Sequence, residues 1–253
     1  MRLYCIDIGN TRTHCAIVEC EQGSFCVEDF ADYQSDSFAE VFVSHSLFEK
    51  SEAQAICWCS VVPEYSKRLE KVIEGIDAMQ LTHTNSPIVL DIDNPAQLGQ
   101  DRIADAVGAG VFLEPPYIVV DMGPAVTIDV VDSLGKYVGG AIAPGMNAFA
   151  NYLGERAAQL PTINPAEADC SLVIGKNTKD AMFVGCAKGF CKLIDGLIAD
   201  IQTELFGNES ATQKTIFTGG STDLLPSEWV GDRIINRNLA HIGLAKAFLE
   251  KRK

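Results

Sequence analysis

The sequence lacks an apolar run of the ~20 residues that a membrane-spanning helix needs, so we expect no membrane span. It is also poor in cations, because 20 lysines and arginines stand against 34 aspartates and glutamates, a net charge of −14. A chain this acidic has no overall attraction for nucleic acid or for an anionic membrane surface. If the protein binds phosphates, it must do so locally, through backbone N–H groups, a few cations or a bound metal.

Metal and disulfide signatures are absent as well. The four histidines are scattered, and the nine cysteines, an odd number, include no CxxC pair. A structural zinc site and a disulfide framework are therefore disfavoured. Most cysteines lie among apolar residues, and an acid, Asp7, comes too early for a signal peptide. These features predict reduced core thiols in a cytoplasmic protein.

Three common enzyme signatures are missing too. No GxGxxG follows an apolar strand, which argues against a dinucleotide-binding Rossmann domain, and no GxSxG marks a nucleophile elbow. Gly175–Thr178 superficially resembles the end of a Walker A motif. However, Cys170 and Asn177 stand where that motif needs glycine and a hydroxyl residue.

The apolar pattern predicts strands that alternate with helices. Two strands, over residues 3–8 and 14–18, form a hairpin around a Gly-Asn-Thr turn. A strand over 55–62 leads to Pro63, which suits the first turn of a helix, and a further helix begins at Asp101. This order favours an α/β fold.

The opening pattern recurs in the second half of the chain. Ile118–Gly123 mirrors Tyr4–Gly9 at an offset of 114 residues, the distance from Asp7 to Asp121. Each copy has an aspartate at the end of an apolar run, a glycine two residues later and a second apolar run after the turn. The recurrence predicts two related halves, with chance repetition of a common pattern as the alternative.

The rest of the second half is predicted to contain a glycine-rich turn region, a long helix, a short strand and a final helix. The glycine-rich region is Val138–Gly145, the long helix covers 178–205, the strand is Thr215–Phe217, and the final helix covers 239–248.

Three turns in this pattern are suited to phosphates or a nucleoside. Asp7–Thr11 offers clustered N–H donors, and its aspartate can hold a hydrated Mg²⁺. Asp121–Asp129 is a second turn of the same kind. Thr218-Gly219-Gly220 lets a flat ligand approach the backbone, because the glycines have no side chains. Ordinary hairpin turns remain the alternative for each segment taken alone.

Gly99-Gln100-Asp101-Arg102 is open to two interpretations. Aspartate is a good helix N-cap and arginine is common in a first turn, so the segment can be purely structural. Equally, Asp101 can be a base that takes the proton of an attacking hydroxyl, while Arg102 pairs with a carboxylate or phosphate.

Together these residues resemble the type III pantothenate kinases of the acetate and sugar kinase/Hsc70/actin superfamily. The resemblance covers nearly the whole chain and depends on seven segments in order. They are Asp7–Thr11, Ser60–Pro63, Asn94-Pro95 with Leu98–Arg102, Asp121–Asp129, Gly139–Gly145, Ile174–Thr178 and Thr218–Gly220.

The resemblance implies two ribonuclease-H-like halves, residues 1–115 and 116–253, with an ATP cleft between them. It implies transfer of the γ-phosphoryl of ATP to the primary hydroxyl of pantothenate, the first step toward coenzyme A. Mg²⁺ accompanies ATP, and a monovalent cation, K⁺ or NH₄⁺, is required. It also implies a homodimer, with neither nucleic acid nor membrane as a partner.

Site residues follow from the same resemblance. Asp101 is the general base, and Asp121 holds the monovalent cation, while Asp7 holds Mg²⁺ through water. The residues implied to bind pantothenate are Gly99, Gln100, Asp101, Arg102 and Thr178. The residues implied to bind ATP are Asp7, Ile8, Gly9, Asn10, Thr11, Arg12, Thr13, His14, Gly123, Pro124 and Gly219.

Two positions depart from the family pattern. Pro124 stands where the family usually has threonine, and it offers neither a hydroxyl nor an N–H donor. Ile92 stands where a tyrosine is usual. A second hypothesis is therefore a ligand-binding or regulatory protein with impaired or no catalysis. A third is a kinase of the same fold that acts on another small hydroxy acid.

Overall fold

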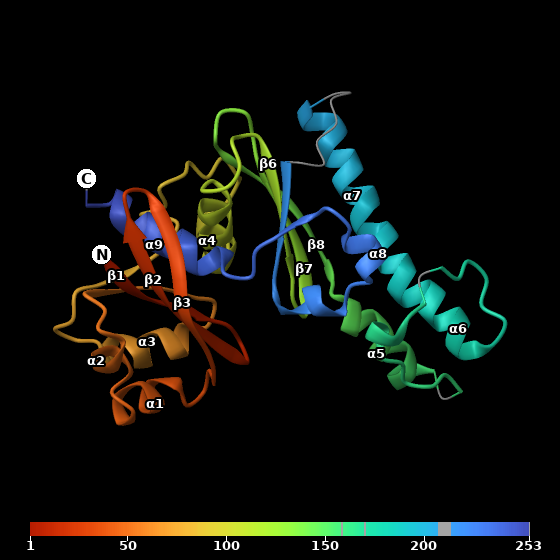
Figure 1. Ribbon diagram of the computed structural model, residues 1–253, viewed down its shortest axis with the longest axis horizontal. Helices are drawn as coiled ribbons and strands as arrows, with labels where there is room; N and C mark the ends of the chain where they lie inside the picture. Colours follow the sequence, from red (N-terminus) through yellow and green to blue (C-terminus); the bar gives the residue numbers. More distant parts are fainter. Residues whose placement is uncertain (158, 170, 207–213, 253) are drawn as a thin grey trace. The chain divides into compact units, whose positions relative to one another are not determined.

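The computed structural model describes residues 1–157, 159–169, 171–206 and 214–252 (Figure 1). Cys170, considered above as part of a Walker-like segment, lies outside the described residues. The chain forms two compact units, each treated separately below. The first unit comprises Met1–Glu114, Gly135–Val138 and Asn238–Lys253, and the second comprises Pro115–Leu134 and Gly139–Arg237.

The first unit is built on a five-stranded mixed sheet with the order β3-β2-β1-β4-β5. β1 pairs antiparallel with β2 and parallel with β4, as expected of a hairpin followed by a crossover through a helix. The strands are β1 (Arg2–Ile8), β2 (Arg12–Glu21), β3 (Ser24–Gln34), β4 (Ala55–Ser60) and β5 (Ala78–Gln80).

Helices cover both faces of this sheet. One face packs against α4 and α9, and alternate residues of β1 turn to the other face, against α1 and α3. Each face is buried by apolar side chains, as the period of two in a strand requires. The helices are α1 (Phe38–Ser44), α2 (Leu47–Ser51), α3 (Pro63–Val72), η1 (Pro95–Gln97), α4 (Gln100–Ala109) and α9 (Leu239–Glu250).

The second unit contains another five-stranded mixed sheet, with the order β10-β9-β6-β7-β8. β6 pairs antiparallel with β7 and parallel with β9, so it takes the same place as β1 in the first sheet. The strands are β6 (Tyr117–Met122), β7 (Ala125–Val131), β8 (Tyr137–Pro144), β9 (Thr215–Thr218) and β10 (Ile234–Ile235).

The helices of the second unit include a long run in which a π-helical segment, η3, interrupts the α-helical hydrogen bonding. This run begins at Thr178, as predicted, and ends at Phe206. The elements are α5 (Met146–Arg156), η2 (Pro165–Glu167), α6 (Thr178–Phe183), η3 (Val184–Lys188), α7 (Gly189–Phe206), η5 (Gly220–Leu224) and α8 (Ser227–Val230).

The predicted α/β class and two similarly ordered sheets are confirmed. One local prediction is wrong, because Val138–Gly145 is mostly the strand β8 and not a turn region. Its glycines serve close packing in an extended segment, since a Cβ at Gly140 would lie 1.7 Å from the carbonyl oxygen of Ile128. Among the described helices, none combines the length and the apolar character that crossing a membrane requires.

Candidate functional site

Asp7 is the last residue but one of β1, at the edge of the sheet where the hairpin turn begins. The Gly9 N–H donates to the Arg12 carbonyl oxygen at 2.9 Å and closes the turn. A Cβ at Gly9 would lie 2.9 Å from that same oxygen, so a side chain there would strain the turn. The sequence therefore folds locally into a tight loop with an acid at its base.

The segment Asp7–His14, predicted to bind the phosphates of ATP and called here the first phosphate motif, has side chains that point in different directions. Ile8 and Thr13 are buried, and the Thr13 hydroxyl donates to Ser35 Oγ at 3.0 Å. Asn10, Thr11 and Arg12 are exposed on the turn. Ile8 and Thr13 can thus serve a ligand only through their backbone.

The Asp7 carboxylate lies among other titratable groups. Its Oδ1 accepts a hydrogen bond from the Cys59 thiol at 3.3 Å. Burial and the negative charge of Asp101 raise the pKa of Asp7 to about 6, partly offset by Cys59 and His14. The structure therefore brings Asp7 and Asp101 into electrostatic range, although 94 residues separate them in the chain.

Asp101 lies in the first turn of α4, where Gly99 occupies the N-cap position. Asp101 is therefore not the N-cap that the structural interpretation required. A Cβ at Gly99 would lie 2.3 Å from Asp101 Oδ1, so glycine leaves room for the carboxylate. The same oxygen accepts the backbone N–H of Arg102 at 2.8 Å. The start of the helix thus holds the aspartate in place.

Gln100 has a role that the sequence did not indicate. Its Oε1 accepts the backbone N–H of Ser60 at 2.9 Å and the side-chain amide of Gln80 at 3.1 Å. The side chain therefore fastens the start of α4 to the ends of β4 and β5. Contact between Gln100 and a substrate would have to use its other atoms.

The second phosphate motif, Asp121–Asp129, spans the turn between β6 and β7 in the second unit. The Gly123 N–H donates to the Ala125 carbonyl oxygen at 3.0 Å, and the Gly145 N–H donates to the Pro124 carbonyl oxygen at 2.9 Å. A Cβ at Gly145 would lie 2.2 Å from the Gly123 oxygen, so glycine is needed where β8 ends. The turn at Gly123 and Pro124 is thereby packed against the chain that leads into α5.

Gly219 lies in the third predicted turn, Thr218-Gly219-Gly220, and places it beside Asp121 of the second. Its φ of +92° favours glycine, and a Cβ there would lie 2.3 Å from Asp121 Oδ1. The hydroxyl of Ser221 donates to the Gly123 carbonyl oxygen at 3.4 Å. The Asp121 carboxylate and the Met122 carbonyl oxygen therefore both lie against Gly219, and oxygens of this kind suit a hard cation. The sequence did not single out Ser221.

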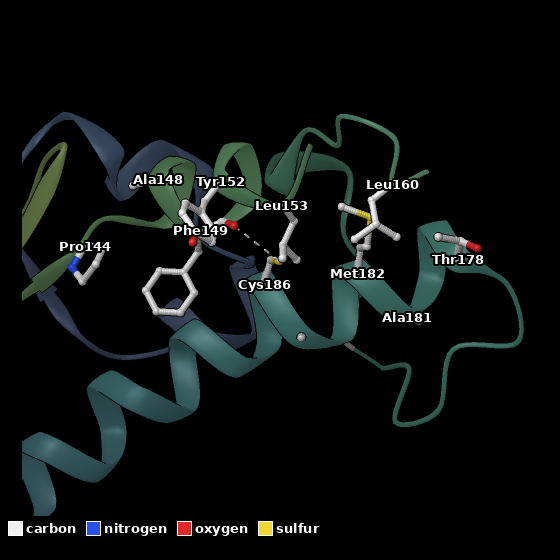
Figure 2. A pocket seen from close by; sticks show the side chains of 11 residues that line it. Pro144, Ala148, Phe149, Tyr152, Leu153, Leu160, Thr178, Ala181, Met182 and Cys186 are labelled. Atoms are coloured by element: carbon white, nitrogen blue, oxygen red, sulfur yellow. Dashed lines mark hydrogen bonds between the residues drawn. The ribbon is translucent and has the colours of Figure 1, made fainter. Parts of the chain in front are cut away.

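Thr178 lies at the start of α6, where the Asn177 side chain caps the helix by accepting the Asp180 N–H at 2.9 Å. It lines a cavity of about 740 Å³ formed by α5, α6 and η3 (Figure 2). Almost all other lining atoms are apolar. The lining residues are Pro144, Ala148, Phe149, Tyr152, Leu153, Leu160, Thr178, Ala181, Met182, Gly185 and Cys186. Sequence reasoning missed this cavity.

The carboxylates of Asp7 and Asp101 suit a hydrated cation better than one bound directly by several side chains. Among the residues that the structure describes, no three or more His, Cys, Asp or Glu side chains gather closely enough to hold a metal ion directly. Asp7 beside Asp101 is nevertheless a site where two negative charges repel, and a hydrated Mg²⁺ would relieve that repulsion. The residues therefore fit a cation that keeps most of its waters.

The architecture is that of the actin-like ATPase fold. Over 98% of this chain and 98% of the other, it superposes on a Campylobacter jejuni protein named after the Baf family of transcriptional activators (TM-score 0.65, 22% identity). Over 100% of this chain and 97% of the other, it superposes on the activator of 2-hydroxyisocaproyl-CoA dehydratase from Clostridium difficile, solved with bound ADPNP (TM-score 0.55, 10% identity).

Within this class, residues 3–200 match the sequence profile of the type III pantothenate kinases. A type III pantothenate kinase of Dehalococcoides mccartyi strain BAV1 is 33% identical over 247 residues, which cover 93% of this chain and 89% of the relative. A type III pantothenate kinase of Thermus thermophilus is 30% identical over 259 aligned positions, which cover 98% of this chain and 99% of the relative. The chain belongs to the type III pantothenate kinase family, whose members are ATP-binding kinases of coenzyme A biosynthesis.

Proposed function

We propose that this protein transfers the γ-phosphoryl group of ATP to the primary hydroxyl of pantothenate. The hydroxyl oxygen forms a bond to the γ-phosphorus, the bond from that phosphorus to the ADP oxygen breaks, and the hydroxyl proton passes to Asp101. Phosphoryl transfer depends mainly on positioning and charge neutralisation, so a fixed base and bound phosphates are the main requirements.

The observation that carries the proposal is the pair formed by Asp7 and Asp101. Burial and mutual repulsion raise the pKa of Asp7 to about 6, a perturbation typical of functional carboxylates. The two side chains come from separate elements, the end of β1 and the start of α4. Two half-buried acids that repel each other weaken the fold, so their juxtaposition favours a role in function.

We assign the remaining residues by their motifs. Asp7–His14, Gly123, Pro124 and Gly219 bind ATP, while Gly99–Arg102 and Thr178 bind pantothenate. Mg²⁺, held through water at Asp7, would neutralise phosphate charge, and a monovalent cation would be held at Asp121. The Asp121 carboxylate and Met122 carbonyl beside Gly219, together with the glycine turns, support these assignments.

We further propose that the active form is a homodimer. Tyr152 lines the apolar cavity of the second unit, yet this residue is 62% exposed. A large apolar opening beside an exposed ring is typical of a surface that a partner covers. A second copy of the chain is the partner that the family resemblance implies.

The alternative is a protein that binds ligands with impaired or no catalysis, and Pro124 is the observation that favours it. Its ring removes the N–H and the hydroxyl that threonine would give to ATP. Restoring threonine separates the hypotheses. In a catalytic protein, Pro124→Thr should lower the KM for ATP by about fivefold to tenfold, because one gained hydrogen bond contributes about 1–1.5 kcal/mol. In an inactive protein it should create turnover.

The direct test measures ADP release with Mg·ATP, with and without pantothenate, in potassium or ammonium buffer and then in sodium. Pantothenate-dependent release that needs potassium or ammonium is expected. Related hydroxy acids in place of pantothenate test the third hypothesis. The absence of release from folded protein would instead favour the non-catalytic alternative.

Asp101→Asn tests the base assignment. We expect turnover to fall about 100-fold or more, the usual scale for a general base. The melting temperature should stay the same or rise slightly, because the repulsion between Asp101 and Asp7 is removed. Glu64→Gln is a suitable control, because Glu64 pairs with Arg68 on the exposed face of α3. Near-normal turnover in Asp101→Asn would show that the base lies elsewhere.

A further inference from the structure

A row of polar side chains crosses the sheet of the first unit. Asp7 on β1 pairs in register with His14 on β2 and with Cys59 on β4, and His14 pairs in register with Asp32 on β3. Residues directly opposite each other on neighbouring strands project to the same face. The row Asp32–His14–Asp7–Cys59 therefore lies on one face, the one that α4 and α9 cover, where Cys59 joins the core.

Side-chain contacts link two neighbouring pairs in this row, and an electrostatic interaction links the third. His14 Nδ1 lies 2.5 Å from Asp32 Oδ1, and the Cys59 thiol donates to Asp7 Oδ1 at 3.3 Å. His14 also acts electrostatically on the Asp7 carboxylate. His14 thus lies between Asp32, which its ring contacts, and Asp7, which it faces in register on the neighbouring strand.

Ring contacts hold that imidazole on a second side. Phe30 stacks on His14 with centroids 5.9 Å apart and planes at 22°. His241 of α9 meets Phe30 edge-on at 5.6 Å. His241 is only 3% exposed, so the core fixes the His241 end of the ring series His14–Phe30–His241. The ring of His14 is therefore held by a carboxylate at its edge and by an aromatic ring on its face.

We propose that Asp32 is a positioning residue for the phosphate motif, acting through His14. With Nδ1 held by Asp32, Nε2 is the remaining ring nitrogen, and it serves an oxygen of the terminal phosphates of a nucleoside triphosphate beside Asp7. This inference rests on the proposed function, since it names a residue that supports the binding of ATP at the first motif.

Fold stability alone does not account for the arrangement. The side chains of His14 and Asp32 are 37% and 45% exposed, and ion pairs at such exposure contribute little to folding. The removal of Asp32 should consequently leave the melting temperature almost unchanged. A change in nucleotide affinity can then be separated from a loss of structure.

The test compares Asp32→Ala, Asp32→Asn and His14→Ala with the wild-type chain by calorimetric titration of a non-hydrolysable Mg·ATP analogue. Asp32→Ala should weaken binding about fivefold to tenfold, the effect of disordering one charge-assisted hydrogen bond. Asp32→Asn should recover part of the affinity, because its amide oxygen still accepts from His14. The KM for ATP should rise while the KM for pantothenate stays constant.

Glu28→Ala is the matched control, because Glu28 also lies on β3 and forms an ion pair, with Arg2 at 2.9 Å, outside the row. It should bind the analogue as the wild type does. In a His14→Ala background, Asp32→Ala should have no further effect, since its action passes through His14.

Two outcomes would overturn the inference on its own. One is that Asp32→Ala binds the analogue as tightly as Glu28→Ala does. The other is that the effects of Asp32→Ala and His14→Ala add, because additivity contradicts an action through His14. If the wild-type chain itself binds no Mg·ATP, the proposed function fails together with the inference. If the wild type binds and phosphorylates normally while Asp32→Ala does the same, only the inference fails.

Discussion

At the scale of single residues, the site is defined by buried or half-buried groups whose charges are unfavourable in the unliganded fold. Asp7 and Asp101 repel each other, and the turn of the first phosphate motif requires glycine at position 9. Unfavourable charge repulsion of this kind is typical of sites that bind charged ligands, because the bound ligand or its cation relieves the repulsion. The proposed site thus costs the fold some stability.

His241 is a second residue of this kind, and it makes a pH prediction. Burial lowers its pKa to about 4, and the His14 backbone and the Asp32 carboxylate offset only part of that shift. A histidine whose folded pKa is depressed stabilises the fold fully above its unfolded pKa of 6.5, and that stability is lost as the pH falls toward 4. Acid should therefore unfold the protein partly through His241.

The expected size of this effect is about 2 kcal/mol between about pH 7.5 and pH 5, from the two pKa values. His241→Phe keeps the ring in the stack without the charge, so its unfolding free energy should depend less on pH by that amount. Urea titrations at both pH values measure it. Exposed His83 gives the control variant, His83→Gln. Parallel pH curves for His241→Phe and the wild type would contradict the prediction.

The sequence predicted some of these residues and could not predict others. Asp7, Asp101 and Asp121 stand beside glycine turns that a linear motif records. Asp32 and Cys59 join the row only through strand register, and β3 carries no motif that reveals its pairing. An apolar pattern predicts which face of a strand is buried, but it does not predict which residue of the neighbouring strand lies opposite in register.

At the scale of elements, the packing of α4 against α9 fixes the helix whose first turn carries Asp101. The two helices lie side by side (Figure 1). Their backbones come close at Gly108 and Gly243. A Cβ at Gly243 would lie 1.8 Å from the Ala104 carbonyl oxygen, and one at Gly108 would lie 2.2 Å from that of Leu239. The apolar stripe of α9 was predicted from the sequence. The stripe did not reveal that α9 packs against α4, which lies about 130 residues earlier in the chain.

This close approach predicts a large effect of a small substitution. Gly243→Ala should destabilise the fold by about 2–3 kcal/mol, because the methyl group forces the helices apart. Gly196→Ala on α7 is the matched control, since a Cβ there meets none of the described atoms within 4 Å. That control should be neutral or more stable by about 0.5–1 kcal/mol through helix propensity. Denaturant unfolding of both variants measures the difference, and equal stabilities would contradict it.

At the scale of the whole chain, the repeat seen in the sequence corresponds to a repeat in topology. β1 and β6 occupy equivalent places in two sheets of the same order, and Asp7 and Asp121 are each the last residue but one of their strands. The recurrence was therefore more than a chance Asp-x-Gly. What the sequence could not show is that the C-terminal helix α9 belongs to the first unit, because contacts between distant segments leave no local pattern.

Association of the whole molecule can be tested at the cavity of the second unit. If a second copy covers this surface, Tyr152→Glu should place a charge in the interface and shift the protein from dimer to monomer. Sedimentation equilibrium would then give a mass near 27.3 kDa in place of twice that value. Tyr152 is 62% exposed in the single chain, so the fold should tolerate the substitution.

Leu134→Glu supplies the matched control, because Leu134 is 76% exposed in the loop between β7 and β8 and does not line the cavity. It adds the same charge to the same unit, and it should leave the dimer intact. A dimer that persists in Tyr152→Glu would place the interface on another surface. A wild-type chain that sediments as a monomer would contradict the homodimer itself, while leaving the assignment of Asp101 untouched, since that residue and Asp7 lie in one unit of one chain.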